Sequence, residues 1–160
     1  MKKLIVATLL ILFITGCKKE ENVSNDFVYK HKFVERDFLP IVAGTLNGSK
    51  VYFLLDTGAS ISILDLKESS RFGVKQGSID DLQIGGYGGI TSNVTKLENV
   101  DIRFGAEIMT EEFKGKDIQY LIKGISQNTG VSIVGIVGNN NISNSNLILD
   151  FETNNILKRR

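Results

Sequence analysis

The sequence predicts an all-β domain, a barrel or a sandwich, with one to three short helices. Two observations support this fold class. Short segments rich in Val, Ile, Leu and Phe follow one another from Phe27 onward, with turn-forming residues between them. Only residues 65–72 and 117–125 have the composition and spacing of helices. We find no internal repeat, so residues 27–160 are expected to form one domain.

Composition excludes several classes of function. The 160 residues include 19 Lys and Arg against 18 Asp and Glu, so the charge balance favours neither nucleic acid nor an anionic surface as a partner. Nine Phe and four Tyr supply a core, which disfavours disorder. One Cys excludes an internal disulfide, and with one His a multi-His metal site or a Ser-His relay is not expected. We therefore expect no metal and no cofactor.

The N-terminus is typical of a secretory signal. Two lysines precede an apolar run over residues 4–14, and small residues follow it. As a helix the run would rise only about 16 Å, whereas a bilayer core is about 30 Å thick, which disfavours the alternative of a membrane-spanning helix. Residues 14–17 resemble the lipobox of bacterial lipoproteins. The resemblance implies that residues 1–16 are removed and that Cys17 is acylated.

Residues 17–26 then form a polar stretch without apolar periodicity, which predicts a solvated tether. Its basic-then-acidic order resembles the surface-export signal of some Gram-negative lipoproteins, and a plain spacer is the alternative. The expected location is therefore the bacterial cell envelope, with the membrane as a partner through Cys17, on the periplasmic side or at the cell surface.

The first half of the body predicts a hairpin and a short helix. Residues 39–46 and 51–55 are apolar runs that flank Asn47-Gly48, a strong signal for a two-residue hairpin turn. A strand over residues 27–34 precedes them. For the helix at 65–72, Asp65 is the expected N-cap and Gly73 the expected C-terminal stop.

The second half predicts a meander, a helix and three further strands. Residues 85–89 are glycine-rich and separate two β-like stretches. The helix at 117–125 places Ile118, Leu121, Ile122 and Ile125 on one face. The predicted strands cover residues 94–97, 100–104, 106–113, 131–137, 147–151 and 156–158. The run at 131–137, which is mainly apolar and β-branched, is typical of a strand that is buried on both faces.

One constellation carries chemistry. The apolar run Val51-Tyr52-Phe53-Leu54-Leu55 ends at Asp56, followed by Thr57, Gly58, Ala59 and Ser60. A carboxylate at the end of a buried strand lies where desolvation perturbs its pKa. Gly58 permits a tight turn and exposes an amide to that carboxylate. A structural alternative is that Asp56 merely begins a turn.

This segment resembles the active site of aspartic proteases, and the resemblance extends from about residue 39 to residue 158. The family also has two bulky apolar residues and a glycine on a strand behind the catalytic loop, which Ile136, Val137 and Gly138 match, with Ile133-Val134-Gly135 a second candidate. Gly86, Tyr87 and Gly88 occupy the place of the flap that covers substrate, although a plain hairpin would look the same. Asp150, in the closing strand, is structural in that pattern.

The chain has one Asp-Thr-Gly, so the resemblance is to single-domain, retropepsin-like members rather than to two-lobed ones. It implies a closed acid-protease-type β-barrel that forms half of a two-fold dimer, with Asp56 of each copy on the axis. The resemblance implies that the paired carboxylates share one proton and activate a water molecule, which hydrolyses the peptide bond. The implied partners are a peptide or protein substrate and a second copy. Thr57 would bond across the axis, Gly58 would hold the carboxylates coplanar, and Ala59 and Ser60 would support the loop.

Two departures keep a second interpretation open. Three asparagines follow Gly138, where many family members have other polar or charged residues, and residues 107–130 form an insertion that a minimal retropepsin lacks. The alternative is a non-catalytic envelope lipoprotein that uses the same barrel for binding or assembly. Aspartyl-phosphate chemistry is disfavoured, because Thr57 stands where its motif has Lys.

Overall fold

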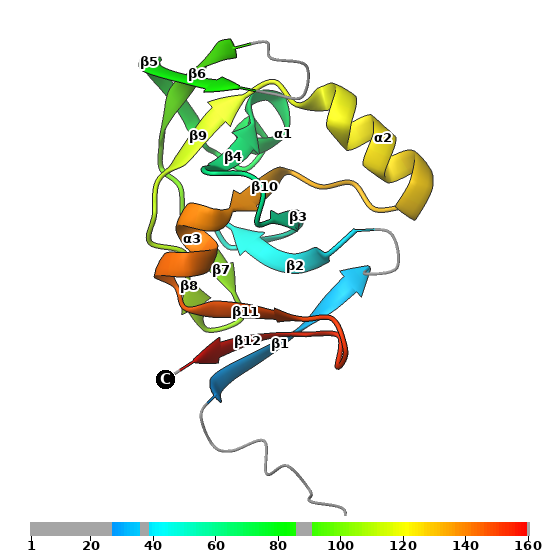
Figure 1. Cartoon of the computed structure of the whole chain (residues 1–160). Coiled ribbons are helices and arrows are strands. Elements are labelled where there is room, and N and C mark those ends of the chain that lie inside the picture. Colours follow the sequence, from blue (N-terminus) through cyan, green and yellow to red (C-terminus); the bar gives the residue numbers. More distant parts are fainter. Residues whose placement is uncertain (1–26, 36–38, 86–90, 160) are drawn as a thin grey trace, which may run out of the picture.

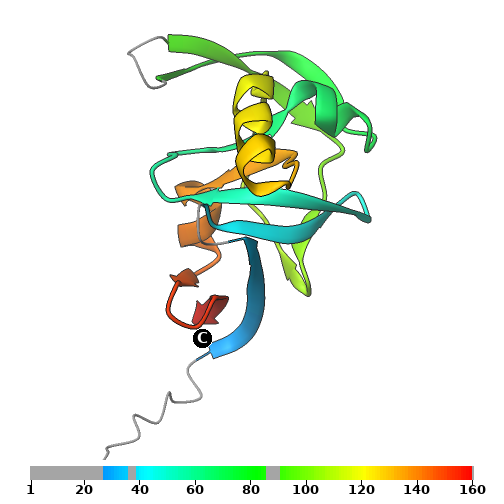
Figure 2. The ribbon, with the colours of Figure 1, turned by 90° about the vertical axis from the view of Figure 1, so that its right-hand side faces the viewer.

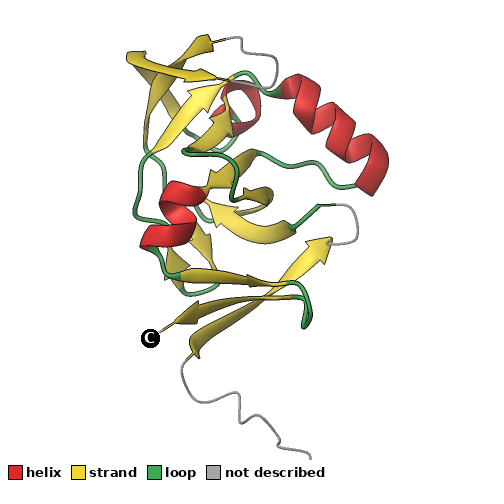
Figure 3. Cartoon of the chain, in the orientation of Figure 1, coloured by secondary structure: helices red, strands yellow, loops and turns green. Residues whose placement is uncertain are grey.

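The computed structural model describes residues 27–35, 39–85 and 91–159, and this part of the chain is mostly β-structure with three short helices (Figures 1 and 3). The strands are β1 (Phe27–Glu35), β2 (Ile41–Leu46), β3 (Ser49–Asp56), β4 (Ser62–Asp65), β5 (Lys75–Gly85), β6 (Thr91–Glu98), β7 (Ile102–Phe104), β8 (Glu107–Ile108), β9 (Phe113–Lys116), β10 (Gly135–Gly138), β11 (Leu147–Asp150) and β12 (Asn155–Arg159). The helices are α1 (Leu66–Ser70), α2 (Gln119–Thr129) and α3 (Asn139–Asn144).

The sheet is open, so the expectation of a closed barrel was wrong. The strand order is β11-β12-β1-β2-β3-β10-β4-β9-β6-β5, and the end strands β11 and β5 lie at opposite ends of the molecule (Figure 1). The reason lies in how strands change partners. β1 pairs with β12 over most of its length and with β2 at Phe33 and Glu35, whereas the far end of β2 pairs with β7. The sheet therefore branches at β2 instead of closing on itself.

The β2–β3 hairpin is confirmed. Asn47 and Gly48 have φ values of 50° and 80°, the left-handed conformations that a two-residue turn of this kind requires. The Asn47 side chain donates to the carbonyls of Phe72 and Asn99 and accepts from the amide of Asp101 at 2.9 Å. This turn therefore also fastens two distant loops.

β10 lies in the centre of the sheet, parallel to β3 and antiparallel to β4. It begins at Gly135, so the prediction of a strand over all of 131–137 was wrong at its first half. Residues 131–134 are irregular, with Ile133 in the outer apolar cluster and Val134 in the main core. Ile133 and Val134 are apolar because the segment crosses between two buried clusters, which does not require strand pairing.

The short helices differ from the predictions mainly in length. The Asp65 carboxylate accepts from the amides of Lys67 and Glu68 at 3.0 and 2.8 Å, which confirms it as the N-cap of α1. α2 extends to Thr129, past the predicted end, and stops at Gly130 with φ 71°. α3 was not predicted. No helix within the described residues is long and apolar enough to cross a membrane.

Two apolar clusters lie on either side of the central strands. The main core contains Phe53, Leu55, Phe104 and Val137, all at most 2% exposed. The outer cluster joins Ile122 and Ile125 of α2 to Ile41, Leu54 and Ile136. Figure 2 shows α2 across this face of the sheet. β3 and β10 are therefore covered on both faces, which fixes the strand ends where the site forms.

Candidate active site

Asp56 is the last residue of β3 and lies between two other strands. Gly138, the last residue of β10, is its partner in the parallel register, and Leu55 donates its amide to the carbonyl of Pro40 on the other side, at 3.0 Å. The side chains of Phe53, Leu54 and Leu55 are buried, whereas Asp56 is half-buried. The structure therefore places the Asp56 carboxylate at the end of a buried strand, as the sequence predicted.

The Asp56 loop, residues 56–60, is a tight turn built around the carboxylate. The amide of Gly58 donates to Oδ1 of Asp56 at 2.8 Å, and the amide of Ala59 donates to its carbonyl at 3.2 Å. A Cβ at position 58 would lie 3.1 Å from Oδ1, closer than most such contacts. Thr57, Gly58 and Ser60 are exposed, so this face of the loop is accessible.

The apolar-apolar-glycine motif at 136–138 lies directly behind this loop. The amide of Asn139 donates to the carbonyl of Ala59 at 2.7 Å. A Cβ at Gly138 would lie 2.4 Å from the carbonyl oxygen of Ile61 and 2.8 Å from that of Ala59. Only glycine fits there, because both obstacles are backbone. The structure therefore places Ile136, Val137 and Gly138 behind Asp56, whereas Gly135 of the second candidate lies opposite Phe53.

Ser62 and Asn140 were missed by sequence reasoning. The Ser62 hydroxyl accepts from the amide of Gly138 at 2.9 Å and donates to Oδ1 of Asn140 at 2.8 Å. Ser62 is fully buried, so these bonds replace its hydration. The run of three asparagines after Gly138 was the available signal, because polar residues that follow a buried strand usually have partners.

A hollow of about 300 Å³ adjoins the Asp56 loop. One wall is the loop and the start of β4, and the other is the end of β5. Its lining is largely apolar or backbone: Gly58, Ala59, Ser60, Ile61, Ile63, Leu82, Gln83, Ile84 and Gly85. The predicted flap residues Gly86, Tyr87 and Gly88 follow β5 but lie outside the described residues.

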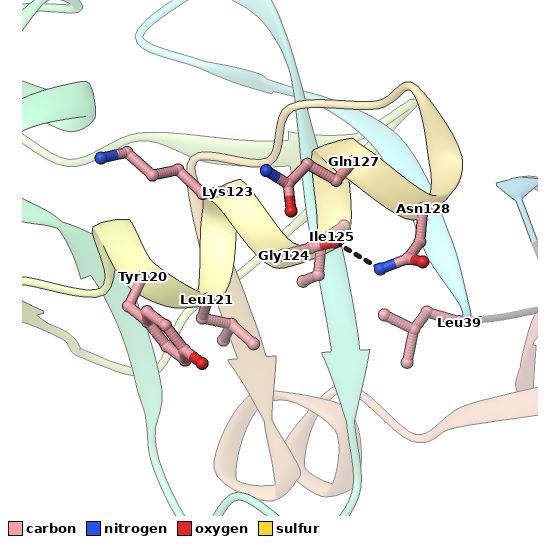
Figure 4. A pocket seen from close by; sticks show the side chains of 8 residues that line it. All are labelled: Leu39, Tyr120, Leu121, Lys123, Gly124, Ile125, Gln127 and Asn128. Atoms are coloured by element: carbon pink, nitrogen blue, oxygen red, sulfur yellow. Dashed lines mark hydrogen bonds between the residues drawn. The ribbon is translucent and has the colours of Figure 1, made fainter.

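Residues 107–130, interpreted from the sequence as an insertion, contain β8, β9 and α2, and β9 lies within the sheet between β4 and β6. A second hollow, about 470 Å³, lies along α2 and faces Leu39, with Leu121 and Ile125 in its lining (Figure 4). Tyr120 at its edge is 94% exposed. The hollow along α2 is separate from the hollow at the Asp56 loop, because the two share no lining residue.

Other acidic groups have structural partners. Asp150 accepts from the amides of Glu152 and Thr153 in the turn after β11, as expected of a structural residue. Within residues 27–35, 39–85 and 91–159, no three His, Cys, Asp or Glu side chains gather as metal ligands would. Of the residues predicted for the site and described by the structure, all lie on the Asp56 loop or on β10 behind it.

Comparisons with a family model and with solved structures both find proteins similar to this chain. The family described as aspartyl protease matches residues 42–140, which include the Asp56 loop, β5, the insertion and β10. Among solved structures, the chain is similar to EIAV protease complexed with the inhibitor HBY-793, at 23% identity and a TM-score of 0.47, over 69% of this chain and 90% of that one. No curated protein matches the chain.

Proposed function

Because this chain belongs to the aspartyl protease family, we propose that it is an aspartic endopeptidase whose active site forms between two copies. The observation that supports this most directly is the Asp56 loop itself. It holds one carboxylate at a strand end, with Gly58 donating to it and an accessible hollow beside it. Aspartic peptidases need two carboxylates, and one loop supplies one.

In the proposed dimer, Asp56 of each copy meets its symmetry mate, and the two carboxylates share one proton. The ionised carboxylate takes a proton from a bound water, which attacks the scissile carbonyl, while the protonated one donates to the carbonyl oxygen. Thr57 bonds across the axis, and the Gly58 amide orients the carboxylate.

The proposed substrate is an extended peptide lying between the Asp56 loop and β5. Ile61, Ile63, Leu82 and Ile84 line the hollow there, so a substrate side chain that enters it is apolar. The proposed cover is the flap predicted at residues 86–88, which lie outside the described part of the chain. Strand-like backbone hydrogen bonds would fix the peptide, and the hollow would select its side chain.

The proposed location is the cell envelope, with acylated Cys17 as the anchor and residues 18–26 as the tether. This rests on the lipobox-like residues 14–17. Replacing Cys17 with Ala is expected to release the protein from the membrane fraction, because acyl chains provide the affinity. Retention of Cys17→Ala in that fraction would reject the proposal.

The test of the function is peptide cleavage by the purified chain. Asp56→Asn is expected to abolish cleavage of a peptide library and to leave the fold intact, and a statine-type inhibitor is expected to block the unchanged protein. Asp117→Asn is the matched control, since an amide oxygen at 117 can still accept from the Gln119 amide as the carboxylate does. Specific activity is expected to rise with protein concentration near the dissociation constant of the dimer.

Three outcomes would overturn parts of the proposal. Full activity of Asp56→Asn would exclude this carboxylate from the mechanism. Activity that is independent of concentration in a proven monomer would exclude a shared site. No cleavage by the unchanged dimer would favour the non-catalytic alternative, a tethered binding or assembly module.

A further inference from the structure

Asn141, in α3, is an uncharged polar residue that is fully buried in the protein. Its Oδ1 accepts from the amide of Glu111 at 3.1 Å, and its Nδ2 donates to the hydroxyl of Ser62 at 2.9 Å and, at 3.3 Å, to the carbonyl of Glu111. The side-chain amide therefore pairs with the backbone of residue 111 much as a neighbouring strand would. Burial of such a group is costly unless all its bonds are made.

The bond to Ser62 carries this attachment to the Asp56 loop. The Ser62 hydroxyl accepts from the amide of Gly138, which lies opposite Asp56 in the strand register. The next amide, that of Asn139, donates to the carbonyl of Ala59 in the loop. Each of these contacts is 2.9 Å or shorter. A displacement of Asn141 therefore reaches the loop through three hydrogen bonds.

The segment that Asn141 holds also reaches the opposite wall of the hollow. We call residues 111–114 the linking segment. Lys114, 12% exposed, contacts Asp80 of β5 at 2.7 Å and Glu112 at 2.6 Å. Two residues beyond Asp80, the same strand begins to line the hollow at Leu82. One end of the linking segment is thus tied to the Asp56 loop, and the other to the strand that precedes the flap.

We infer that Asn141 is a positioning residue, which fastens the linking segment to Ser62 and so fixes the Asp56 loop relative to β5. It contacts neither substrate nor the reacting atoms. Its catalytic consequence rests on the proposed function, whereas its effect on the loop does not. Misplacement of reacting groups by a fraction of an ångström lowers turnover, so the variant loses kcat rather than affinity.

The test measures amide hydrogen exchange and kinetics in the full chain. Asn141→Ser removes the bridge, and Ser62→Ala removes the hydroxyl that receives it. Ser62→Thr keeps a hydroxyl and is the rescue variant. Asn144→Ser is the matched control, because Asn144 is exposed on the same helix.

Exchange at Gly58, Gly138 and Asn139 is expected to quicken roughly tenfold or more in Asn141→Ser and Ser62→Ala, relative to the β2–β3 hairpin in the same molecule. Ser62→Thr and Asn144→Ser should leave that ratio unchanged. A uniform rise over both regions, or no rise, would overturn the inference, since either means that Asn141 contributes only to global stability. If Asn141→Ser does not fold, Asn141→Asp decides the same point, because it keeps the oxygen that accepts from the Glu111 amide and removes the amide that donates to Ser62. Ser62→Ala does not decide it alone, because it also removes the acceptor of the Gly138 amide and the donor to Asn140.

Kinetics supply the second readout. The two disrupting variants are expected to lose about tenfold to a hundredfold in kcat per folded molecule, with KM within about twofold. Unchanged kcat beside quickened exchange would overturn the catalytic part of the inference. If the unchanged protein cleaves nothing, the proposed function fails, and the exchange ratio still tests the positioning role.

Discussion

The Asp56 loop and β5 face the same hollow but are held in different ways. The loop is fixed by buried groups, because Gly138 has no room for a side chain and Ser62 is fully enclosed. β5 is an edge strand with mostly exposed residues, Ile79 among them at 70%. Beyond β6, it lies next to α1 and makes the ion pair of Asp80 with Lys114. The difference agrees with the proposed roles, a fixed carboxylate and a movable cover over substrate, because elements with few buried contacts open at low free energy.

The largest effect is expected at the back of the loop. Gly138→Ala forces a Cβ against the carbonyls of Ile61 and Ala59, and neither can move without moving the Asp56 loop. We expect a loss of about 3 kcal/mol in the free energy of unfolding and loss of peptide cleavage. Denaturant unfolding measures the first, and peptide hydrolysis by the folded fraction measures the second.

Gly124→Ala is the control for that substitution, and its expected sign is opposite. Gly124 lies within α2 with open space around its Cβ position, so alanine should stabilise the helix by about 0.5–1 kcal/mol. Equal effects of the two substitutions would contradict the close packing that we assign to Gly138.

A moderate effect is expected at β5. Lys114→Met keeps the aliphatic part of the side chain but removes the cation that contacts Asp80 and Glu112. Because these groups are partly exposed, KM for peptide is expected to rise only about two- to fivefold, while kcat changes less. A selective fall in kcat with unchanged KM would mean that Lys114 acts on the Asp56 loop rather than on the cover.

Acid should loosen the same contact. The hydrogen bond from Lys114 holds the pKa of Asp80 below its usual range, and the hydrogen bond from the Leu82 amide lowers this pKa further. Burial raises the pKa but does not outweigh these bonds, and the positive charge of Lys96 adds to the lowering. A carboxyl whose pKa is lower folded than unfolded contributes stability above about pH 4, and this is lost as the pH falls through its folded value. Exchange of β5 amides should therefore quicken in acid, relative to the β2–β3 hairpin. If the exchange of β5 amides relative to the hairpin quickens equally in acid in Asp80→Asn, a group other than Asp80 causes the acid effect.

The smallest effect is expected on the outer face. Tyr120 is 94% exposed at the edge of the hollow along α2. Tyr120→Ser should change the free energy of unfolding by less than about 0.5 kcal/mol and leave peptide cleavage unchanged. A loss of cleavage would connect the outer face to the site and blur the distinction between the two regions.

Local patterns predicted much of the fold. The Asn47-Gly48 turn, the Asp65 cap and the strand that ends at Asp56 each depend on neighbours in sequence, and all three are present. The open sheet was not predictable, because it depends on which strands β2 pairs with at each end.

The site followed the same division. Asp56, Gly58 and Gly138 were recognisable from short motifs. Ser62 and Asn141 were not, because their hydrogen bond joins residues 79 positions apart, and the run of asparagines that contains Asn141 does not indicate which residue it bonds. The flap residues remain a prediction, since residues 86–90 lie outside the described part of the chain.

The pairing of Asp56 with Gly138 also bears on biosynthesis. The carboxylate emerges from the ribosome long before the strand that must support it, and most of the intervening chain has to fold around the gap. A nascent or truncated polypeptide that stops short of β10 therefore carries the acidic residue in an unsupported turn. Under the proposed function, the active site therefore forms only after β10 has been synthesised.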